Sequence, residues 1–203
     1  MKPQSSPPAV ALDELYKYLS GFISLSRSEF DRMQPYIEIR EFDKKEKILR
    51  EGETEGYLNI VFRGLVRQYI PTRDREVTIQ LATEGHVVHS ELSFHNRKPS
   101  VSELETIEST TLLSITYEHL QELYDLFPFM EKLGRLMISD LFIRQDKRYI
   151  DQLGKSTRQR FLEYVRSHPH MLQRVPQKYL ASYLNIKPET FSRLKHLLRP
   201  RRT

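Results

Sequence analysis

The sequence predicts an α+β protein built from an antiparallel β-roll with flanking helices, a long helix and a C-terminal helix-turn-helix domain. Three observations carry this prediction. Short strand-like runs fill residues 36–115, a helical pattern spans residues 127–153, and a helix-turn-helix spacing occupies residues 177–194. Many short strands separated by glycine turns are typical of an antiparallel sandwich or barrel. We therefore expect one domain over residues 12–126, a connecting helix over 127–153 and a second domain over 154–203.

The N-terminal segment changes character near residue 12. Residues 1–11 are rich in proline and serine, which predicts a disordered tail. From residue 12 to about residue 35, leucines and aromatic residues recur at helical spacing. Ser26 and Glu29 have the spacing of a capping box, so a second helix is expected to start there.

The middle of the chain has the texture of a β-roll. Alternating apolar and polar residues predict half-buried strands, and glycines at positions 52, 56, 64 and 85 separate them. The strand-like runs are YIEI, EKIL, YLNIVF, LVRQYI, EVTIQL, HVVH and TLLSIT.

The predicted long helix carries an apolar stripe at Met130, Leu133, Met137 and Leu141, spaced three or four residues apart. Further apolar residues lie on its other sides, so the helix is expected to pack against its own domain and against a partner helix. We expect a homodimer whose helix contacts are these four residues. The alternative is a core helix buried within one chain. After it, Thr157 is expected to cap a helix that Pro169 ends near Ser167.

The stretch from Gln177 to Leu194 fits a helix-turn-helix position by position. Leu180, Leu184 and Phe191 have the spacing of inward-facing residues. Asn185 falls at the turn, where a residue that tolerates a positive φ is needed. Pro188 fits the first position of the second helix, because the N–H that proline lacks would be unpaired there.

The outward positions of the second helix are expected to contact DNA. Glu189, Thr190, Ser192 and Arg193 lie in its N-terminal half, the part of a recognition helix that reaches base edges. Basic residues around them are expected to contact phosphates. They are Lys178, Lys187, Lys195, Arg199, Arg201 and Arg202. The alternative is a two-helix packing motif without DNA.

The charge distribution supports a double-stranded DNA partner. Residues 155–203 contain twelve lysines and arginines and two acids, a net charge of +10, whereas the first 154 residues carry a net charge of −5. A basic segment on an acidic body is the electrostatic footprint of a phosphate-backbone binder.

These residues together resemble the cyclic-AMP receptor / fumarate-nitrate regulator (Crp/Fnr) superfamily of bacterial transcription factors, from about residue 12 to residue 198. Residues 188–193 (PETFSR) are similar to the recognition-helix segment of the family, and Glu189 and Arg193 fall on its base-reading positions. Residues 51–53, 63–67 and 84–86 are similar to its β-roll turns. The resemblance implies a sensor domain, a dimer helix, and DNA and RNA polymerase as partners. Pro188 stands where many members carry a base-contacting arginine, which implies a different operator.

The same resemblance places an effector pocket at Val88, Ser90, Glu91, Leu92, Ser100 and Ser102. Members that bind cyclic nucleotides carry a Gly-Glu pair for the ribose and an Arg-Ser/Thr pair for the phosphate. Here the first pair reads Ser90-Glu91, and residues 98–103 (KPSVSE) contain no arginine. A phosphate without a guanidinium partner loses a strong charge-assisted bond, so we expect no cyclic AMP or cyclic GMP binding and leave the effector open.

Other function classes receive little support from the residues. The chain has no cysteine, which excludes disulfides, thiol catalysis and cysteine-based metal sites. No catalytic motif is found, so we expect no enzyme and no cofactor. No apolar run reaches the roughly 18 residues of a membrane span and no secretory signal is seen, which favours a cytoplasmic protein without a membrane partner. Two alternatives stay open, a small-molecule-binding module without specific DNA recognition and a metal sensor using His86, His89, Glu91 and His95.

Overall fold

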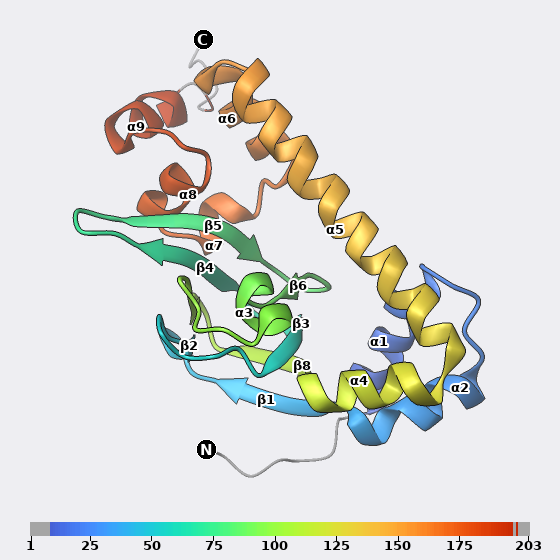
Figure 1. The fold of residues 1–203 in the computed structure, drawn as a ribbon. Coiled ribbons are helices and arrows are strands. Elements are labelled where there is room, and N and C mark those ends of the chain that lie inside the picture. Colours follow the sequence, from blue (N-terminus) through green and yellow to red (C-terminus); the bar gives the residue numbers. More distant parts are fainter. Residues whose placement is uncertain (1–8, 197, 199–203) are drawn as a thin grey trace.

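The computed structural model describes residues 9–196 and residue 198, and its elements follow in the predicted order (Figure 1). Two helices and a 3₁₀ turn come first: α1 (Ala9–Ser20), α2 (Arg27–Met33) and η1 (Gln34–Tyr36). The strands are β1 (Glu38–Phe42), β2 (Lys47–Leu49), β3 (Tyr57–Arg63), β4 (Val66–Pro71), β5 (Glu76–Ala82), β6 (Val87–Val88), β7 (Glu103–Thr106) and β8 (Thr110–Thr116). The other helices are α3 (Glu91–Asn96), α4 (Tyr117–Leu126), α5 (Pro128–Gly154), α6 (Thr157–Ser167), α7 (Met171–Arg174), α8 (Gln177–Tyr183) and α9 (Pro188–His196).

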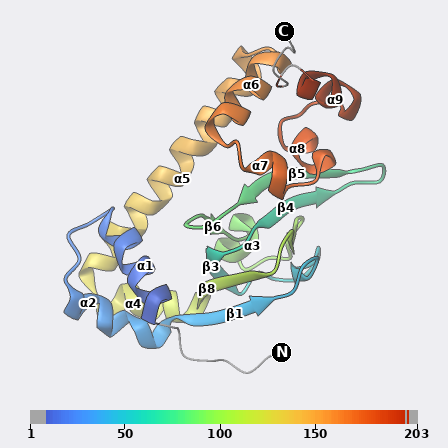
Figure 2. The same ribbon diagram turned by 180° about the vertical axis from the view of Figure 1, so that it is seen from behind.

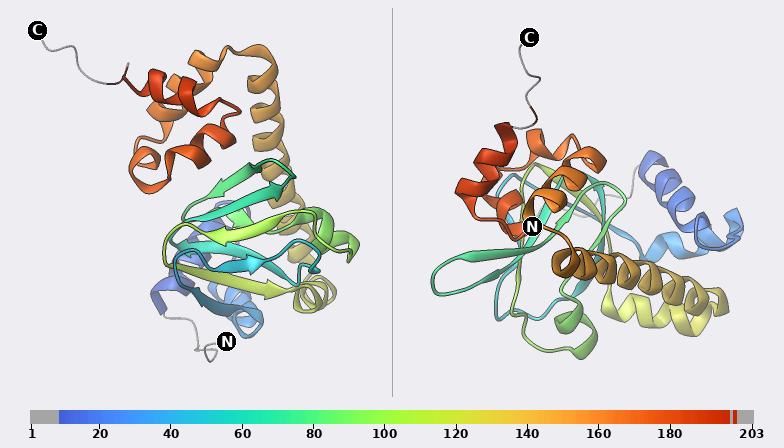
Figure 3. Two further views of the ribbon diagram at one scale, coloured as in Figure 1. Left: turned by 90° about the vertical axis from the view of Figure 1, so that its left-hand side faces the viewer. Right: turned by 90° about the horizontal axis from the view of Figure 1, so that it is seen from above.

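The strands form two four-stranded antiparallel sheets, which confirms the predicted α+β class with an antiparallel roll. Their orders are β1-β8-β3-β6 and β2-β7-β4-β5, and they stack as layers in the side view (Figure 3, left). Residues alternate between the two faces of a strand, so inward side chains from both sheets share one core. That core contains Leu49, Val61, Val66, Ala82, Val88, Leu104 and Leu112.

One turn of the roll requires glycine. Gly64 joins β3 to β4 with a φ of +105°, a region that residues with a side chain rarely adopt. A Cβ atom there would lie 2.5 Å from the Thr110 hydroxyl oxygen and 2.8 Å from the Thr110 Cα. The close approach of this turn to β8 therefore leaves no space for a larger residue.

Helix α5 connects the two ends of the molecule, from α1, α2 and α4 at one end to α6–α9 at the other (Figures 1 and 2). Its first turns pack into the N-terminal core, where Met130 and Leu133 are buried with Leu15, Leu19 and Leu123. The prediction that Met130 and Leu133 contact a partner helix is therefore wrong, because the chain's own α1 and α4 cover that face. Met137 is partly buried against the same core.

The C-terminal helices share a second core with the roll. Phe161, Leu180 and Phe191 of helices α6, α8 and α9 are buried together with Leu65 and Leu81 of the roll. The rings of Phe161 and Phe191 meet edge to face, with centroids 5.1 Å apart. The C-terminal helices are therefore packed directly on the β-roll in this structure.

The helix caps and helix ends agree in part with the sequence predictions. The Ser26–Glu29 capping box is present, and α6 ends at Ser167, before Pro169. The cap of α6 is Ser156, paired with Gln159, and not Thr157, which is its first helical residue. Helix α1 begins at Ala9, so three residues of the predicted tail are helical, and residues 1–8 lie outside the described part. No helix among the described residues is long and apolar enough to cross a membrane.

Candidate functional site

Helices α8 and α9 lie where the two helices of the helix-turn-helix were expected. Asn185, between them, has a φ of 53°, and the following Ile186 is buried against Ala181 and Leu184. The Ile186 backbone N–H donates to the Ala181 carbonyl at 2.8 Å, which closes the turn. Helix α9 begins at Pro188, as its ring geometry favours. The turn therefore fixes the angle between the two helices through one left-handed residue and one buried side chain.

The predicted base-reading residues lie on the outer side of α9. Glu189, Ser192 and Arg193 are exposed and Thr190 is half-buried, whereas Phe191 on the opposite side is 1% exposed. The Arg193 guanidinium donates to the Thr190 hydroxyl at 3.3 Å, so its fork lies along the helix surface. The side chains expected to contact bases are thus separated from those that hold the helix in place.

The residues expected to contact phosphates are described in part. Lys178 and Lys187 are exposed near the start of α8 and of α9, and Lys195 is half-buried in α9. The Lys178 ammonium lies 4.7 Å from the centre of the Tyr179 ring. Arg199, Arg201 and Arg202 lie outside the described residues.

An ion-pair cluster joins this domain to the roll, and sequence reasoning did not predict it. The Arg174 guanidinium donates to both carboxylate oxygens of Glu84, at 2.8 and 2.9 Å, and of Glu108, at 2.8 and 3.0 Å. It also donates to the Gly64 carbonyl at 3.0 Å. Burial by itself raises the pKa of Glu84, but the bonds from Arg174 and from backbone N–H groups outweigh it and lower that pKa to about 2.

Helix α8 also lies along β5 (Figures 1 and 2). A buried arginine of β4 contacts it there. The Arg67 side chain is 1% exposed, and its guanidinium lies between the rings of Tyr69 (3.9 Å) and Tyr179 of α8 (3.7 Å). The Ser182 hydroxyl accepts from the Thr78 N–H at 2.9 Å. An arginine with a neighbouring tyrosine in a strand gives no sequence signal for a partner 112 residues further along the chain.

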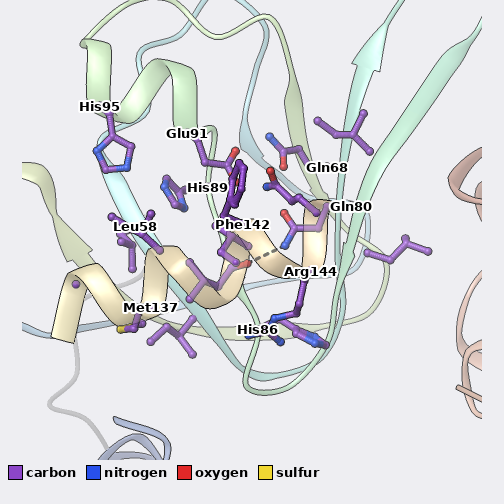
Figure 4. Close-up of a pocket in the computed structure, with 18 of the residues that line it drawn as sticks. Leu58, Gln68, Gln80, His86, His89, Glu91, His95, Met137, Phe142 and Arg144 are labelled. Atoms are coloured by element: carbon purple, nitrogen blue, oxygen red, sulfur yellow. Dashed lines mark hydrogen bonds between the residues drawn. The ribbon is translucent and has the colours of Figure 1, made fainter. Parts of the chain in front are cut away.

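A cavity of about 1050 Å³ lies between the roll, α3, α5 and α8. In Figure 4, His89 and Glu91 lie near Gln68 and Gln80 on the roll side, and Met137, Phe142 and Arg144 project from α5. Ser182 and Tyr183 of α8 are also among the residues that line it. The cavity is therefore lined by the β-roll, by the long helix α5 and by the C-terminal helix α8.

Of the six residues predicted for an effector pocket, Glu91 alone lines this cavity. Leu92 is 69% exposed on the outer face of α3, so its predicted pocket role is wrong. Val88 is buried between the sheets. Ser90, Ser100 and Ser102 are buried and bond to each other, with the Ser100 hydroxyl donating to Ser90 at 2.9 Å. Their hydroxyls are engaged in a local network behind the cavity wall.

The histidines expected in a metal sensor do not form a metal site among the described residues, where no group of three ligand side chains comes together. The centroids of the His89 and His95 rings lie 5.7 Å apart. The His86 Nδ1 accepts from the Thr83 N–H at 3.1 Å. Burial lowers the pKa of His89 to about 3, with a smaller effect from His95, so the His89 ring is neutral.

Comparisons with known proteins find one matching family model and several solved structures of similar fold. Residues 39–126 match the family model of the cyclic nucleotide-binding domain, and no curated protein matches the chain. FixK2 from Bradyrhizobium japonicum is similar at 20% identity and a TM-score of 0.64, over 79% of this chain and 83% of FixK2. The c-di-GMP responsive global regulator CLP of Xanthomonas campestris is similar at 18% identity and a TM-score of 0.63, over 85% and 91% of the two chains.

DNR from Pseudomonas aeruginosa is similar at 22% identity and a TM-score of 0.52, over 91% of this chain and 86% of DNR. At these identities the likeness shows a shared fold, and the order of roll, long helix and C-terminal helices is the one described above. The family model therefore covers the β-roll and α4, and the chain as a whole shares the fold of FixK2, CLP and DNR.

Proposed function

We propose that this chain is a sequence-specific DNA-binding transcription regulator that acts as a homodimer on a two-fold symmetric operator. The observation that carries the proposal is the helix-turn-helix of α8 and α9. Its second helix buries Phe191 and leaves Glu189, Ser192 and Arg193 free to enter a major groove. Such a regulator would act through RNA polymerase, in the cytoplasm of a bacterial cell.

The chemistry of α9 suits base recognition. An arginine can donate bidentately to guanine O6 and N7, and a glutamate can accept from cytosine N4. Arg193 is held by a single long bond of 3.3 Å to Thr190, which a base edge can replace. Lys178 and Lys187 flank this surface and would neutralise phosphates on either side of the groove.

The homodimer is proposed to form along a different face of α5 from the one predicted. Ile143, Ile150 and Leu153 are 65%, 58% and 71% exposed, and none of them lines the cavity. In a heptad, Ile143 and Ile150 occupy position a and Leu153 occupies position d. Isoleucine at a with leucine at d favours two-stranded parallel coiled coils. A second copy of α5 is therefore the occupant that fits this stripe.

Coupling between sensor and DNA-binding domain is proposed to run through β5 and α8. The Arg148 guanidinium donates to the carbonyls of Ile79 in β5 and of Tyr183 in α8, the latter at 2.9 Å. Arg148 also lines the cavity. A ligand that binds one arrangement of β5, α5 and α8 more tightly than another would shift the spacing of the two recognition helices.

We further propose that cyclic AMP and cyclic GMP are not the effectors. Arg97, next to the pocket segment, donates to the Glu55 carbonyl at 2.7 Å and approaches Glu118 at 3.7 Å. The buried serines Ser90 and Ser100 bond to each other. A cyclic phosphate would thus find no free guanidinium beside Glu91 among the described residues of this segment.

Salt dependence tests the DNA-binding function. Binding of a mixed-sequence duplex should weaken steeply between 50 and 200 mM salt, because each neutralised phosphate contributes a slope of about −0.9 in log K against log salt. Lys187→Gln should make the slope less steep by about 1 for each bound subunit. Lys132→Gln, exposed at the far end of α5, is the matched control and should not change it. An affinity that does not change with salt, or an equal change in slope for the two variants, would contradict the proposal.

A further inference from the structure

We propose that the cavity between the roll and α5 takes an uncharged, largely apolar small molecule that hydrogen-bonds to His89 and Glu91. This inference names the ligand class of the proposed regulator and depends on that function only for the effect of the ligand on DNA. Four features of the cavity carry it: its walls, its carboxyl group, its engaged arginines and an unpartnered histidine.

The walls of the cavity are mainly hydrocarbon. Leu58 and Ile60 of β3 face it from the roll, and Met137, Leu141 and Phe142 face it from α5. The volume of about 1050 Å³ is at the upper end for small-molecule sites in proteins. Transfer of apolar surface from water to such walls favours a ligand whose surface is mostly hydrocarbon.

The charged groups of the cavity disfavour an anion. The Glu91 carboxyl lies on the cavity wall, and burial raises its pKa. An anion beside it would be repelled by the ionised form, whereas the protonated form can donate a hydrogen bond to a neutral ligand.

The two arginines of the cavity wall already have partners. Arg148 donates to the carbonyls of Ile79 and Tyr183 and lies 4.0 Å from the centre of the Tyr183 ring. Arg144 pairs with Asp140 one helical turn away. An anionic ligand would therefore compete with Asp140 for Arg144 and with two backbone carbonyls for Arg148.

His89 supplies the polar group that points to a ligand. Its side chain is 3% exposed, lines the cavity and has no hydrogen-bonding partner for either ring nitrogen among the described residues. A neutral imidazole offers one N–H donor and one nitrogen acceptor. A buried polar group without a partner raises the free energy of the folded protein. A hydroxyl, amine or carbonyl on the ligand that bonds to His89 would therefore make binding more favourable.

Two dyes with the same anilinonaphthalene skeleton test the ligand class in the full-length chain. N-phenyl-1-naphthylamine is uncharged, and 8-anilinonaphthalene-1-sulfonate adds a sulfonate. The uncharged dye should show saturable fluorescence enhancement with one site per chain, at least about 10-fold tighter than the sulfonate. Millimolar cyclic AMP should not displace it.

Variants locate the dye within the protein. Leu141→Trp and Ile138→Trp fill the cavity from α5 and should weaken binding of the uncharged dye at least about 10-fold. Val101→Trp adds the same ring at a residue that is 57% exposed and outside the cavity, and it should leave binding unchanged. Circular dichroism identifies a variant that fails to fold, and the second filling variant then decides the result.

A histidine pair tests the polar contact. His89→Phe keeps an aromatic wall but removes both ring nitrogens, and it should weaken binding of the uncharged dye about 5-fold or more. His95→Phe, at an exposed histidine of the same wall, should change it less than 2-fold. Equal effects of the two variants would overturn the role of His89.

The inference as a whole is overturned if the sulfonate binds as tightly as the uncharged dye or if cyclic AMP displaces the dye. Equal effects of the cavity-filling variants and Val101→Trp would overturn it as well. Duplex binding of the same preparations keeps the two proposals separate. A chain that binds the uncharged dye as described but binds no DNA would refute the regulator function and leave the ligand class standing.

Discussion

Arg174→Ala removes the ion-pair cluster that joins the helix-turn-helix domain to the roll. The guanidinium makes five hydrogen bonds, of which four reach the carboxylates of Glu84 and Glu108 and one reaches the Gly64 carbonyl. The side chains of Arg174, Glu84 and Glu108 are 24%, 45% and 32% exposed, so water replaces part of what is lost. With each partly exposed pair contributing at most about 1 kcal/mol and the carbonyl a similar amount, we expect a loss of about 2 kcal/mol in the free energy of unfolding.

Urea unfolding followed by far-ultraviolet circular dichroism measures this loss, since the chain has no tryptophan for fluorescence. Because Leu65 and Leu81 of the roll share a core with Phe161 and Phe191, the wild-type chain should unfold in one transition. Arg166→Ala, at an exposed position of α6, removes the same charge and should cost less than about 0.5 kcal/mol.

The pH dependence gives an independent reading of the same cluster. Glu84 has a pKa lowered to about 2 in the folded protein, from an ordinary value of 4.5. Its stabilising effect is therefore fully present above about pH 4.5 and is lost as the pH falls toward 2. The difference in unfolding free energy between wild type and Arg174→Ala should shrink over that range. The reasoning would be refuted if Arg174→Ala lost no more unfolding free energy at pH 7 than Arg166→Ala does. It would also be refuted if the wild-type chain unfolded in urea in two transitions.

Three further changes test the dimer, the base contact and the roll. Ile150→Lys should convert the proposed dimer to a monomer, as measured by sedimentation equilibrium. The control Ile138→Lys, outside the heptad positions of α5, should leave the dimer intact. A dimer that persists in Ile150→Lys would place the interface elsewhere. Arg193→Ala should weaken binding to a selected operator by about 1–3 kcal/mol and relax the preference at one base position, as measured by competition between duplexes. An equal loss of affinity on every duplex would exclude a base contact. Gly64→Ala should destabilise the fold by about 1–3 kcal/mol in urea unfolding, because a methyl group at φ +105° meets Thr110; an unchanged midpoint would show that the turn can relax.

The parts of the fold that follow local rules were predictable from the sequence. Alternation identified most strands, and the spacing of Leu180, Asn185, Pro188 and Phe191 gave the helix-turn-helix with its turn residue in the predicted conformation. These features depend on neighbours in the sequence. The short elements α3, α4, α7 and β7 were not predicted, because four to ten residues carry too little periodicity to be distinguished from loops.

Local sequence patterns did not predict the tertiary arrangement. A helix that is apolar on several sides does not reveal which side its own domain covers, so Met130 and Leu133 were assigned to a dimer interface although they are core residues. Leu92 was placed in a pocket by its position in the chain, but α3 turns it outward. The Arg67–Tyr179 contact joins positions whose neighbours give no hint of each other.

Selection of bound duplexes from a random DNA pool, with the full-length chain at near-physiological salt, tests the central claim most directly. We expect enrichment of a two-fold symmetric motif whose half-sites are centred roughly one helical turn, about 10 base pairs, apart. The same selection with Arg193→Ala should lose information at one position of each half-site. Recovery of sequences without any shared motif, or of a single unpaired half-site, would contradict a dimeric, sequence-specific regulator.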